Sequence, residues 1–300
     1  MRKLRFHPCG NYKESYEEEL AIFSTDFGRF WLLVGLFCLF VVIPLVSSPY
    51  VLYVVNHMGI AAIGAIGLNL LIGYTGQISL GHGAFFGVGA YGAAILATAG
   101  GFPFWAALVC SGLITALVGT IFGLPSVRLK HLYLTIATLA GQFILQYLFV
   151  SWEGLTKGPE GIMLPRASFL GIDIKGDRVF FFAIFLSFVV LTWIAVNLLR
   201  TRYGRAFIAI RDNDRAAEGM GIPLFKYKLL SFAISSFYAG FAGGLSAYYI
   251  GSITPEPYTL LLSIEFIAMI IIGGLGSIPG SVFGAVFITL LNESLSHATG

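Results

Sequence analysis

Residues 51–72 read VLYVVNHMGIAAIGAIGLNLLI, an apolar run without a charged side chain. A transmembrane helix needs about 20 such residues, because the hydrocarbon core is about 30 Å thick and a helix rises about 1.5 Å per residue. The run belongs to a longer stretch, between Trp31 and Val127, that contains no Asp, Glu, Lys or Arg. Hydrophobic residues make up 57% of the chain, more than a soluble domain can bury. We therefore predict an all-α polytopic membrane protein.

The other apolar runs predict about 8–10 transmembrane helices, some of them broken. Clear candidates lie at 31–48, 51–72, 80–99, 103–125, 131–151, 179–199 and 229–250. Two shorter runs, 259–272 and 277–291, are either full crossings or half-helices that meet inside the membrane. A β-barrel is disfavoured, because barrel strands alternate apolar and polar residues.

The charged residues predict the orientation. Residues 1–30 carry five basic and five acidic side chains, Arg128 to Lys130 carries two basic ones, and 200–228 carries seven. The 151–178 loop has four of each sign. Cytoplasmic loops are enriched in Lys and Arg. We therefore expect a cytoplasmic tail at 1–30 and a transmembrane domain at 31–300, with 151–178 outside and 200–228 inside. The tail is too long and too polar for a cleavable signal.

Several kinds of chemistry are not indicated. The sequence has no GxxxxGK[ST] loop, HExxH, GxSxG or CxxC motif. The three cysteines, Cys9, Cys38 and Cys110, are not placed for an extracellular disulfide. We expect no enzymatic activity, no metal site and no cofactor.

Two glycine-rich segments interrupt apolar runs, NLLIGYTGQISLGHGA at 69–84 and IIGGLGSIPG at 271–280. Gly73, Gly76 and Ile78 recur 200 residues later as Gly273, Gly276 and Ile278. Matching interruptions in two halves of a chain indicate a transporter built from an internal repeat, with broken helices beside its path. Close helix packing is the alternative explanation for the glycines, and the only one for GVGAYGAA at 87–94.

Two ionisable residues lie inside predicted helices. Glu265 stands in LLLSIEFIAMII, where a charge is costly, so it either ties two helices together or takes part in gating. His82 fits a hydrogen-bonded packing role better than a proton relay. Gln142 and Gln146, four residues apart, could bridge to another helix. The candidate path and gate residues are Gly73, Thr75, Gln77, Ser79, Glu265, Gly273 and Gly276.

The segment 200–228, RTRYGRAFIAIRDNDRAAEGMGIPLFKYK, is called the charged island here. Its charges alternate in sign, while Phe207, Ile210, Ala217 and Met220 supply apolar contacts, which predicts short helices broken near 219–223. It is either a solvated loop or a surface that buries one face against a soluble partner.

Three segments resemble signatures of the LivM-type permeases of branched-chain amino acid ABC importers. They are GYTGQISLGHGAFFGVGAYGAA, RDNDRAAEGMGIPLFKYKLLSFAISSFYAGFAGGL and SIEFIAMIIIGGLGSIPGSVFGAVFITLLNE, and they occur in the family's order. RLKHLYLTIATLA and LTKGPEGI fit the elements between them. The likeness covers nearly everything after about residue 50, although Lys157 and Pro159 alter the usual external loop.

The resemblance implies one half of a heterodimeric permease in the cell (inner) membrane, surrounded by lipid and without a nucleic-acid partner. Its expected partners are a LivH-like permease subunit, two cytoplasmic ABC ATPases of LivG/LivF type and an external or periplasmic solute-binding protein. Leu, Ile or Val would pass by alternating access, and the island would be the coupling loop. The residues expected to dock the ATPases are Arg211, Asp212, Ala216, Ala217 and Gly221.

Other functions remain open on the sequence. Related permeases are expected to carry urea or short amides. A secondary transporter would work alone on an ion gradient, with Glu265 or His82 binding the coupling ion. A membrane scaffold would explain the glycines by packing and the island by a structural partner.

Overall fold

The computed structural model describes residues 43–127, 132–165, 168–169, 172–173 and 176–299. The chain forms two compact units, Met1–Leu52 and Tyr53–Gly300. In the first unit the described elements are α3 (Ile43–Val46) and the start of α4 (Pro49–Thr75). The predicted tail 1–30, most of the predicted span 31–48, Cys9, Cys38 and the pair Arg128 and Lys130 lie outside the described residues.

Helices make up most of the second unit. After α4 come α5 (His82–Thr98), α6 (Phe104–Val127), α7 (Leu132–Ser151), α8 (Glu153–Thr156), the 3-10 helix η2 (Gly158–Glu160), α9 (Asp177–Arg200), α10 (Arg202–Asp212), α11 (Asp214–Gly219), α12 (Leu224–Ile250), α13 (Leu260–Gly273) and α14 (Ile278–Thr299). The strands are two short antiparallel pairs. β1 (Ile162–Met163) pairs with β4 (Ser252–Ile253), and β2 (Ser168–Phe169) pairs with β3 (Ile172–Asp173).

Six helices of the described chain are long and apolar enough to cross a membrane, which confirms the all-α polytopic prediction. They are α4, α9 and α12 in full and the Phe104–Leu124, Tyr133–Ser151 and Ile278–Leu295 parts of α6, α7 and α14. α13, with 14 residues, is shorter than a full crossing, and α5 has 17. The predicted repeat stays a prediction.

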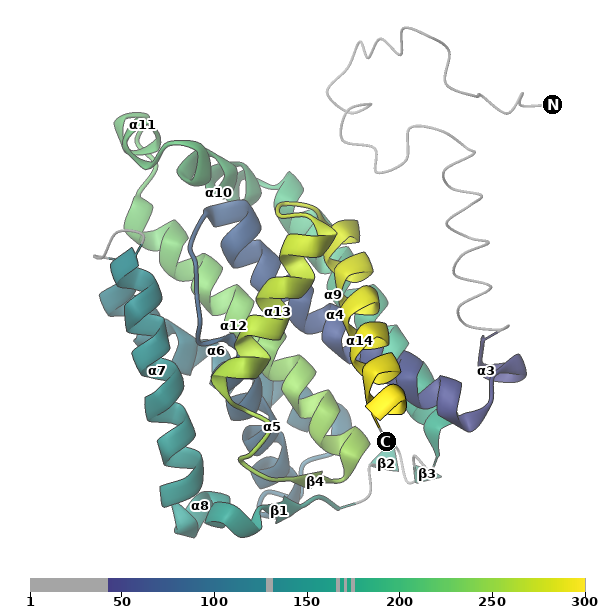
Figure 1. Cartoon of the computed structure of the whole chain (residues 1–300). Helices are drawn as coiled ribbons and strands as arrows, with labels where there is room; N and C mark the ends of the chain where they lie inside the picture. Colours follow the sequence, from purple (N-terminus) through teal and green to yellow (C-terminus); the bar gives the residue numbers. More distant parts are fainter. Residues whose placement is uncertain (1–42, 128–131, 166–167, 170–171, 174–175, 300) are drawn as a thin grey trace, which may run out of the picture. The chain divides into compact units, whose positions relative to one another are not determined.

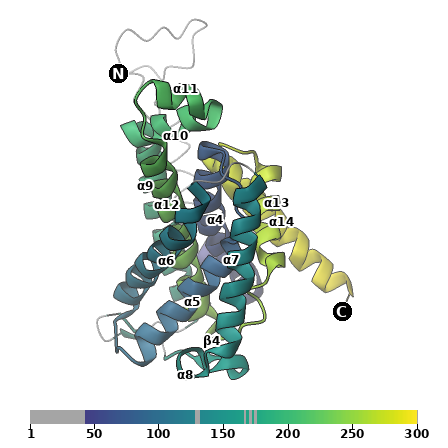
Figure 2. The ribbon, with the colours of Figure 1, turned by 90° about the vertical axis from the view of Figure 1, so that its left-hand side faces the viewer.

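The predicted outer loop and the charged island lie at opposite ends of the second unit. Figures 1 and 2, a quarter turn apart, show α10 and α11 at one end and α8 and β4 at the other. These ends are called the α10 end and the β4 end. The sides of the membrane expected for 151–178 and 200–228 stay predictions.

Small residues bring α5, α6 and α12 together in the core. A Cβ atom at Gly89 would collide with the backbone of Gly240, and one at Gly243 would collide with the carbonyl group of Phe86. Close approach of this kind is what small residues permit in membrane proteins. The packing interpretation of 87–94 is confirmed.

Candidate functional site

Both predicted helix interruptions are present. α4 ends at Thr75, and Gly76 has a φ of +71°. α13 ends at Gly273, Gly274 and Gly276 have φ values of +107° and +77°, and α14 follows from Ile278. Backbone with positive φ favours glycine, because it lacks a Cβ atom. The glycines therefore turn the chain at both breaks.

The first break leads the chain back into the membrane. Gly76 lies beside Arg211 of α10, whereas the Nε2 atom of His82 is 3.0 Å from the carbonyl oxygen of Gly64. Gly64 precedes Thr75 by 11 residues, a rise of about 16 Å, which is about half of the hydrocarbon core. Residues 76–81 therefore run back along α4, as Figure 1 shows, and α5 begins beside the middle of α4.

Side chains from neighbouring helices bind the amide groups at this buried start of α5. Gly83 N donates to Ser263 Oγ (2.8 Å), and Ala84 N donates to Gln142 Oε1 (2.8 Å). Leu80 N donates to Thr138 Oγ1 (3.0 Å). The first amides of a helix have no intrahelical acceptor, and none of them can find water in the bilayer core. The predicted bridging by Gln142 is thereby confirmed.

The two breaks contact each other through Asn69, which is fully buried. Asn69 Nδ2 donates to Ser277 O (2.9 Å) and Ser281 Oγ (2.6 Å), and Gly276 N donates to Asn69 Oδ1 (3.0 Å). A Cβ atom at Gly73 would collide with Asn69 and with the Gly276 amide. We call Asn69, Gly73, Gly76, Gly276 and Ser277 the glycine junction.

Arg211 of the charged island reaches into the glycine junction. Its Nη1 atom donates to Gly73 O at 2.9 Å, while Nε and Nη2 each lie 3.2 Å from Asp212 Oδ1. Gly73 belongs to the last turn of α4, where carbonyl groups lack intrahelical donors and a positive charge is favourable. The side chain expected to dock an ATPase is therefore bonded to the end of a broken membrane helix.

The charged island forms the two short helices α10 and α11, and a side chain caps the N-terminus of each. Thr201 Oγ1 accepts from Tyr203 N (3.2 Å), and Asn213 Oδ1 accepts from Ala216 N (3.1 Å). The predicted break near 219–223 is confirmed, because α11 ends at Gly219 and α12 starts at Leu224.

The expected docking residues differ in their exposure. Asp212, Ala216 and Gly221 are exposed, and Gly221 has a φ of +83°. Ala217 is only 1% exposed, so it packs beneath this surface, whereas Met220 is 76% exposed.

The predicted path residues do not all come together. Thr75, Gln77 and Ser79 are buried. Thr75 Oγ1 donates to Leu70 O (2.9 Å), Gln77 Nε2 donates to Ser231 Oγ (2.7 Å), and Ser79 Oγ accepts from Gly81 N (3.3 Å). Gly273 packs against Gly280 at the start of α14. Glu265 lies apart from the junction and lines a cavity between α4, α12, α13 and α14.

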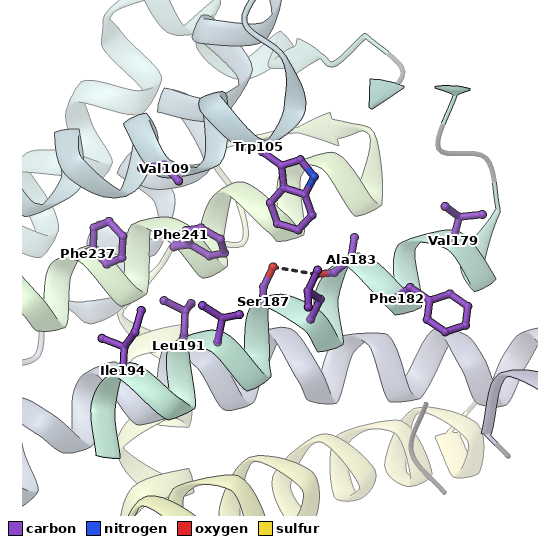
Figure 3. Close-up of a pocket in the computed structure, with 12 residues that line it drawn as sticks. Trp105, Val109, Val179, Phe182, Ala183, Ser187, Leu191, Ile194, Phe237 and Phe241 are labelled. Atoms are coloured by element: carbon purple, nitrogen blue, oxygen red, sulfur yellow. Dashed lines mark hydrogen bonds between the residues drawn. The ribbon is translucent and has the colours of Figure 1, made fainter. Parts of the chain in front are cut away.

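An apolar groove of about 810 Å³ lies between α6, α9 and α12 (Figure 3). Trp105 from α6, Phe182 and Leu191 from α9 and Phe241 from α12 contribute to its walls. The Ser187 hydroxyl in it donates to Ala183 O at 2.7 Å. A polar solute must keep its hydrogen bonds when it leaves water. The groove therefore does not suit an amino acid or an amide.

Sequence reasoning gave Asn69 no role, although it opens the quoted segment 69–84. The available signal was an amide side chain in an apolar helix, four residues before a glycine. Its partners follow about 210 residues later, so the contact could not be found from local spacing. Of the four residues expected to supply apolar contacts, Phe207, Ile210 and Ala217 are buried, whereas Met220 is 76% exposed.

The family model described as "Branched-chain amino acid transport system / permease component" matches residues 50–300. The LivM permease protein of the high-affinity branched-chain amino acid transport system of Escherichia coli K12 is 32% identical over 285 residues, which is 87% of this chain and 67% of that protein. The LivM protein of Salmonella typhimurium is 33% identical over 252 residues, 76% of this chain and 59% of its own length. The chain thus spans about two thirds or less of these relatives.

LivH from Salmonella typhimurium, also named as a permease protein of that system, is 27% identical over 259 residues. These residues are 79% of this chain and 82% of LivH. No solved structure matches. With a family model that covers residues 50–300 and six candidate membrane spans, the chain belongs to the permease components of branched-chain amino acid transport systems, as a multi-pass membrane protein of LivM type.

Proposed function

We propose that the chain is one transmembrane subunit of an ATP-driven (ABC) importer that moves Leu, Ile and Val into the cytoplasm by alternating access. Similarity to both LivM and LivH proteins supports a second, LivH-like permease subunit. In this proposal the chain is not an enzyme. Two cytoplasmic ATPases of LivG/LivF type hydrolyse ATP, and an external solute-binding protein delivers the substrate. The chain lies in the cell (inner) membrane, with its N-terminus and the α10 end in the cytoplasm.

The ATPases bind the end of α10, the exposed face of α11 and the turn that follows it. This docking surface contains Asp212, Arg215, Ala216, Glu218, Met220 and Gly221. An apolar side chain among charged residues suits a protein partner, because interfaces bury apolar anchors inside a polar rim. Ala217 packs beneath the surface, and Lys228 Nζ lies 3.7 Å from Asp214 Oδ2, which holds α11 against α12.

The contact between Arg211 and the glycine junction is the observation that carries this proposal. A docking surface alone would fit any soluble partner, but here the island is bonded to the end of α4 at the point where the two helix breaks meet. If the ATPases moved α10, Arg211 would pull on the Gly73 carbonyl group. The movement would therefore displace the two helix breaks that meet there. The glycines provide backbone that can change direction there.

Uptake of labelled leucine tests the proposal, in cells with this gene intact or deleted. We expect loss of uptake on deletion, and also on ATP depletion at a maintained membrane potential, because ATPases drive the transport. Uptake that needs the gene but ignores ATP would instead indicate a gradient-driven carrier. Leucine uptake that survives deletion, in cells with no second leucine system, would contradict the branched-chain assignment and favour urea or short amides.

A further inference from the structure

The apolar groove between α6, α9 and α12 has a recessed floor and a raised rim on α9 (Figure 3). Residues four apart share one face of a helix, and two such rows of α9 line the groove. The floor row is only 4–8% exposed and consists of Ala183, Ser187 and Leu191. The rim row is 45–51% exposed and consists of Phe182, Leu186 and Val190. The groove is therefore a slot along the outer side of α9.

The slot is long as well as deep. On α9 it runs from Val179 to Ile194, which is a rise of about 22 Å. One leaflet supplies half of the hydrocarbon core, or about 15 Å, so the slot is longer than the apolar part of one leaflet. Its volume of about 810 Å³ lies within the range of about 300–1,000 Å³ that small-molecule sites occupy.

The shape of the slot suits a single hydrocarbon chain. The Ser187 hydroxyl on the floor already donates to Ala183 O, so it needs no polar ligand. Membrane helices pack closely where small residues lie at the surface, but here the small residues lie below the larger side chains of the rim. A helix with its side chains is about 10–12 Å across, whereas an acyl chain is thin enough to reach the floor.

A basic side chain stands where the slot begins, at the β4 end. Arg178 is exposed, directly precedes Val179 and shares a helix face with Phe182. The neighbouring Asp177 is turned toward α12, where its Oδ1 atom accepts from the Tyr249 hydroxyl at 3.2 Å. A guanidinium group binds phosphate oxygens through two parallel hydrogen bonds. The slot therefore begins beside a group that is complementary in charge to a phospholipid headgroup.

We propose that this slot binds one acyl chain of a phospholipid and that Arg178 binds the phosphate of the same lipid. The chain lies along the floor of α9 and contacts α6 and α12, because space left empty there would lose dispersion contacts. An anionic lipid such as phosphatidylglycerol is favoured, because its net negative charge is attracted by Arg178. In the proposed orientation the lipid belongs to the external leaflet. The site itself does not depend on which solute the protein transports.

The test uses the full chain with the subunits that purify with it, delipidated in detergent. Dioleoylphosphatidylglycerol and dioleoylglycerol, which lacks the phosphate, are added in turn, and native mass spectrometry gives the dissociation constant of the tightest-bound lipid. Arg178→Gln should weaken binding of the phosphatidylglycerol about tenfold or more, because a charge-assisted hydrogen bond is lost. It should leave binding of dioleoylglycerol unchanged.

Ala183→Phe places a ring on the floor of the slot and should weaken binding of both lipids about tenfold or more. Ala140→Phe is its matched control, because Ala140 is exposed on α7 and does not line the slot. Lys157→Gln is the control for Arg178→Gln, because it removes a positive charge from an exposed residue outside the slot. Both controls should leave lipid binding unchanged.

Four results would overturn the site. They are no tight binding of the phosphatidylglycerol to the unaltered protein, an affinity unaffected by Arg178→Gln, an affinity unaffected by Ala183→Phe, and an equal loss in a variant and its control. Loss of a second permease subunit from Ala183→Phe, with lipid binding retained, would instead make the slot a protein interface. Because Arg178 is exposed, Arg178→Gln tests the site even where Ala183→Phe disturbs folding.

Discussion

At the scale of single residues, Arg211 ties the charged island to the end of α4. Its bond to the Gly73 carbonyl is charge-assisted, and such bonds contribute about 1.5–3 kcal/mol. Arg211→Gln should therefore lower leucine uptake about tenfold or more, while the ATPases still bind the permease and hydrolyse ATP. Uptake, hydrolysis and co-purification, measured on the same membranes, check this separation.

Arg202→Gln is the control for this prediction, because Arg202 is exposed at the start of α10 and belongs neither to the docking surface nor to the glycine junction. It should leave uptake, hydrolysis and co-purification unchanged. Loss of ATPase co-purification in Arg211→Gln would show that Arg211 acts in docking itself, as the family resemblance implied, and would contradict the coupling role.

Gly73 offers a second test at this scale. Replacing glycine with alanine inside a helix normally stabilises it by about 0.5–1 kcal/mol. At Gly73, however, the new Cβ atom would meet the backbone amide of Gly276 and the side-chain amide of Asn69, which is held in place by its hydrogen bonds to Ser277, Ser281 and Gly276. Such overpacking costs about 1–3 kcal/mol, so Gly73→Ala should lower the thermal unfolding midpoint of the purified complex. Gly154→Ala, where nothing lies within 4 Å, should leave it unchanged, and an equal midpoint in both variants would contradict the prediction.

At the scale of elements, the apolar runs predicted the membrane helices well, because bilayer thickness sets their length. The run 51–72 became Pro49–Thr75, and 103–125 became Phe104–Val127. α12 begins at Leu224 instead of 229, because a helix can extend beyond the bilayer and include Lys226 and Lys228. Counting apolar residues stops at such charges, whereas helix formation does not.

The depth of α5 could not be predicted from the sequence. Residues 80–99 look like an ordinary span, but the contact between His82 and Gly64 shows that this helix starts beside the middle of α4. Such contacts join residues that local periodicity does not relate. For the same reason, the sequence indicated where both helices break, but it did not indicate that Asn69 joins the two breaks.

The buried start of α5 gives a test at the element scale. Gln142→Leu removes the acceptor of the Ala84 amide and leaves that group unpaired inside the protein, at a cost of about 1–3 kcal/mol. We expect a lower thermal unfolding midpoint of the purified complex. Gln146→Leu is the matched control, one turn farther along the same helix face and only partly buried, and it should have little effect. Equal destabilisation by both changes would show that Gln142 does not act through its hydrogen bond to the Ala84 amide.

At the scale of the whole molecule, the features discussed divide between the two ends of the second unit. The glycine junction and the docking surface lie toward the α10 end, and the cavity lined by Glu265 lies toward the β4 end. α4 contributes to both the junction and the cavity, and the junction loop with Gly276 and Ser277 joins α13 to α14, which both line the cavity. A shift at the junction would therefore reach the cavity through these helices, which is the arrangement that alternating access requires.

Two exposed methionines at opposite ends test which end binds the ATPases. Met220 is 76% exposed beside α11, and Met163 is 85% exposed on β1 at the β4 end. A buried apolar anchor at an interface loses its favourable contact when it becomes a charge, at a cost of about 2 kcal/mol or more. Met220→Asp should therefore reduce co-purification of the ATPases about tenfold or more and abolish ATP-dependent uptake. Met163→Asp should leave co-purification intact, because the β4 end faces the external side in the proposed orientation. The opposite result would reverse the proposed orientation, and full co-purification with both variants would place the docking contact away from Met220.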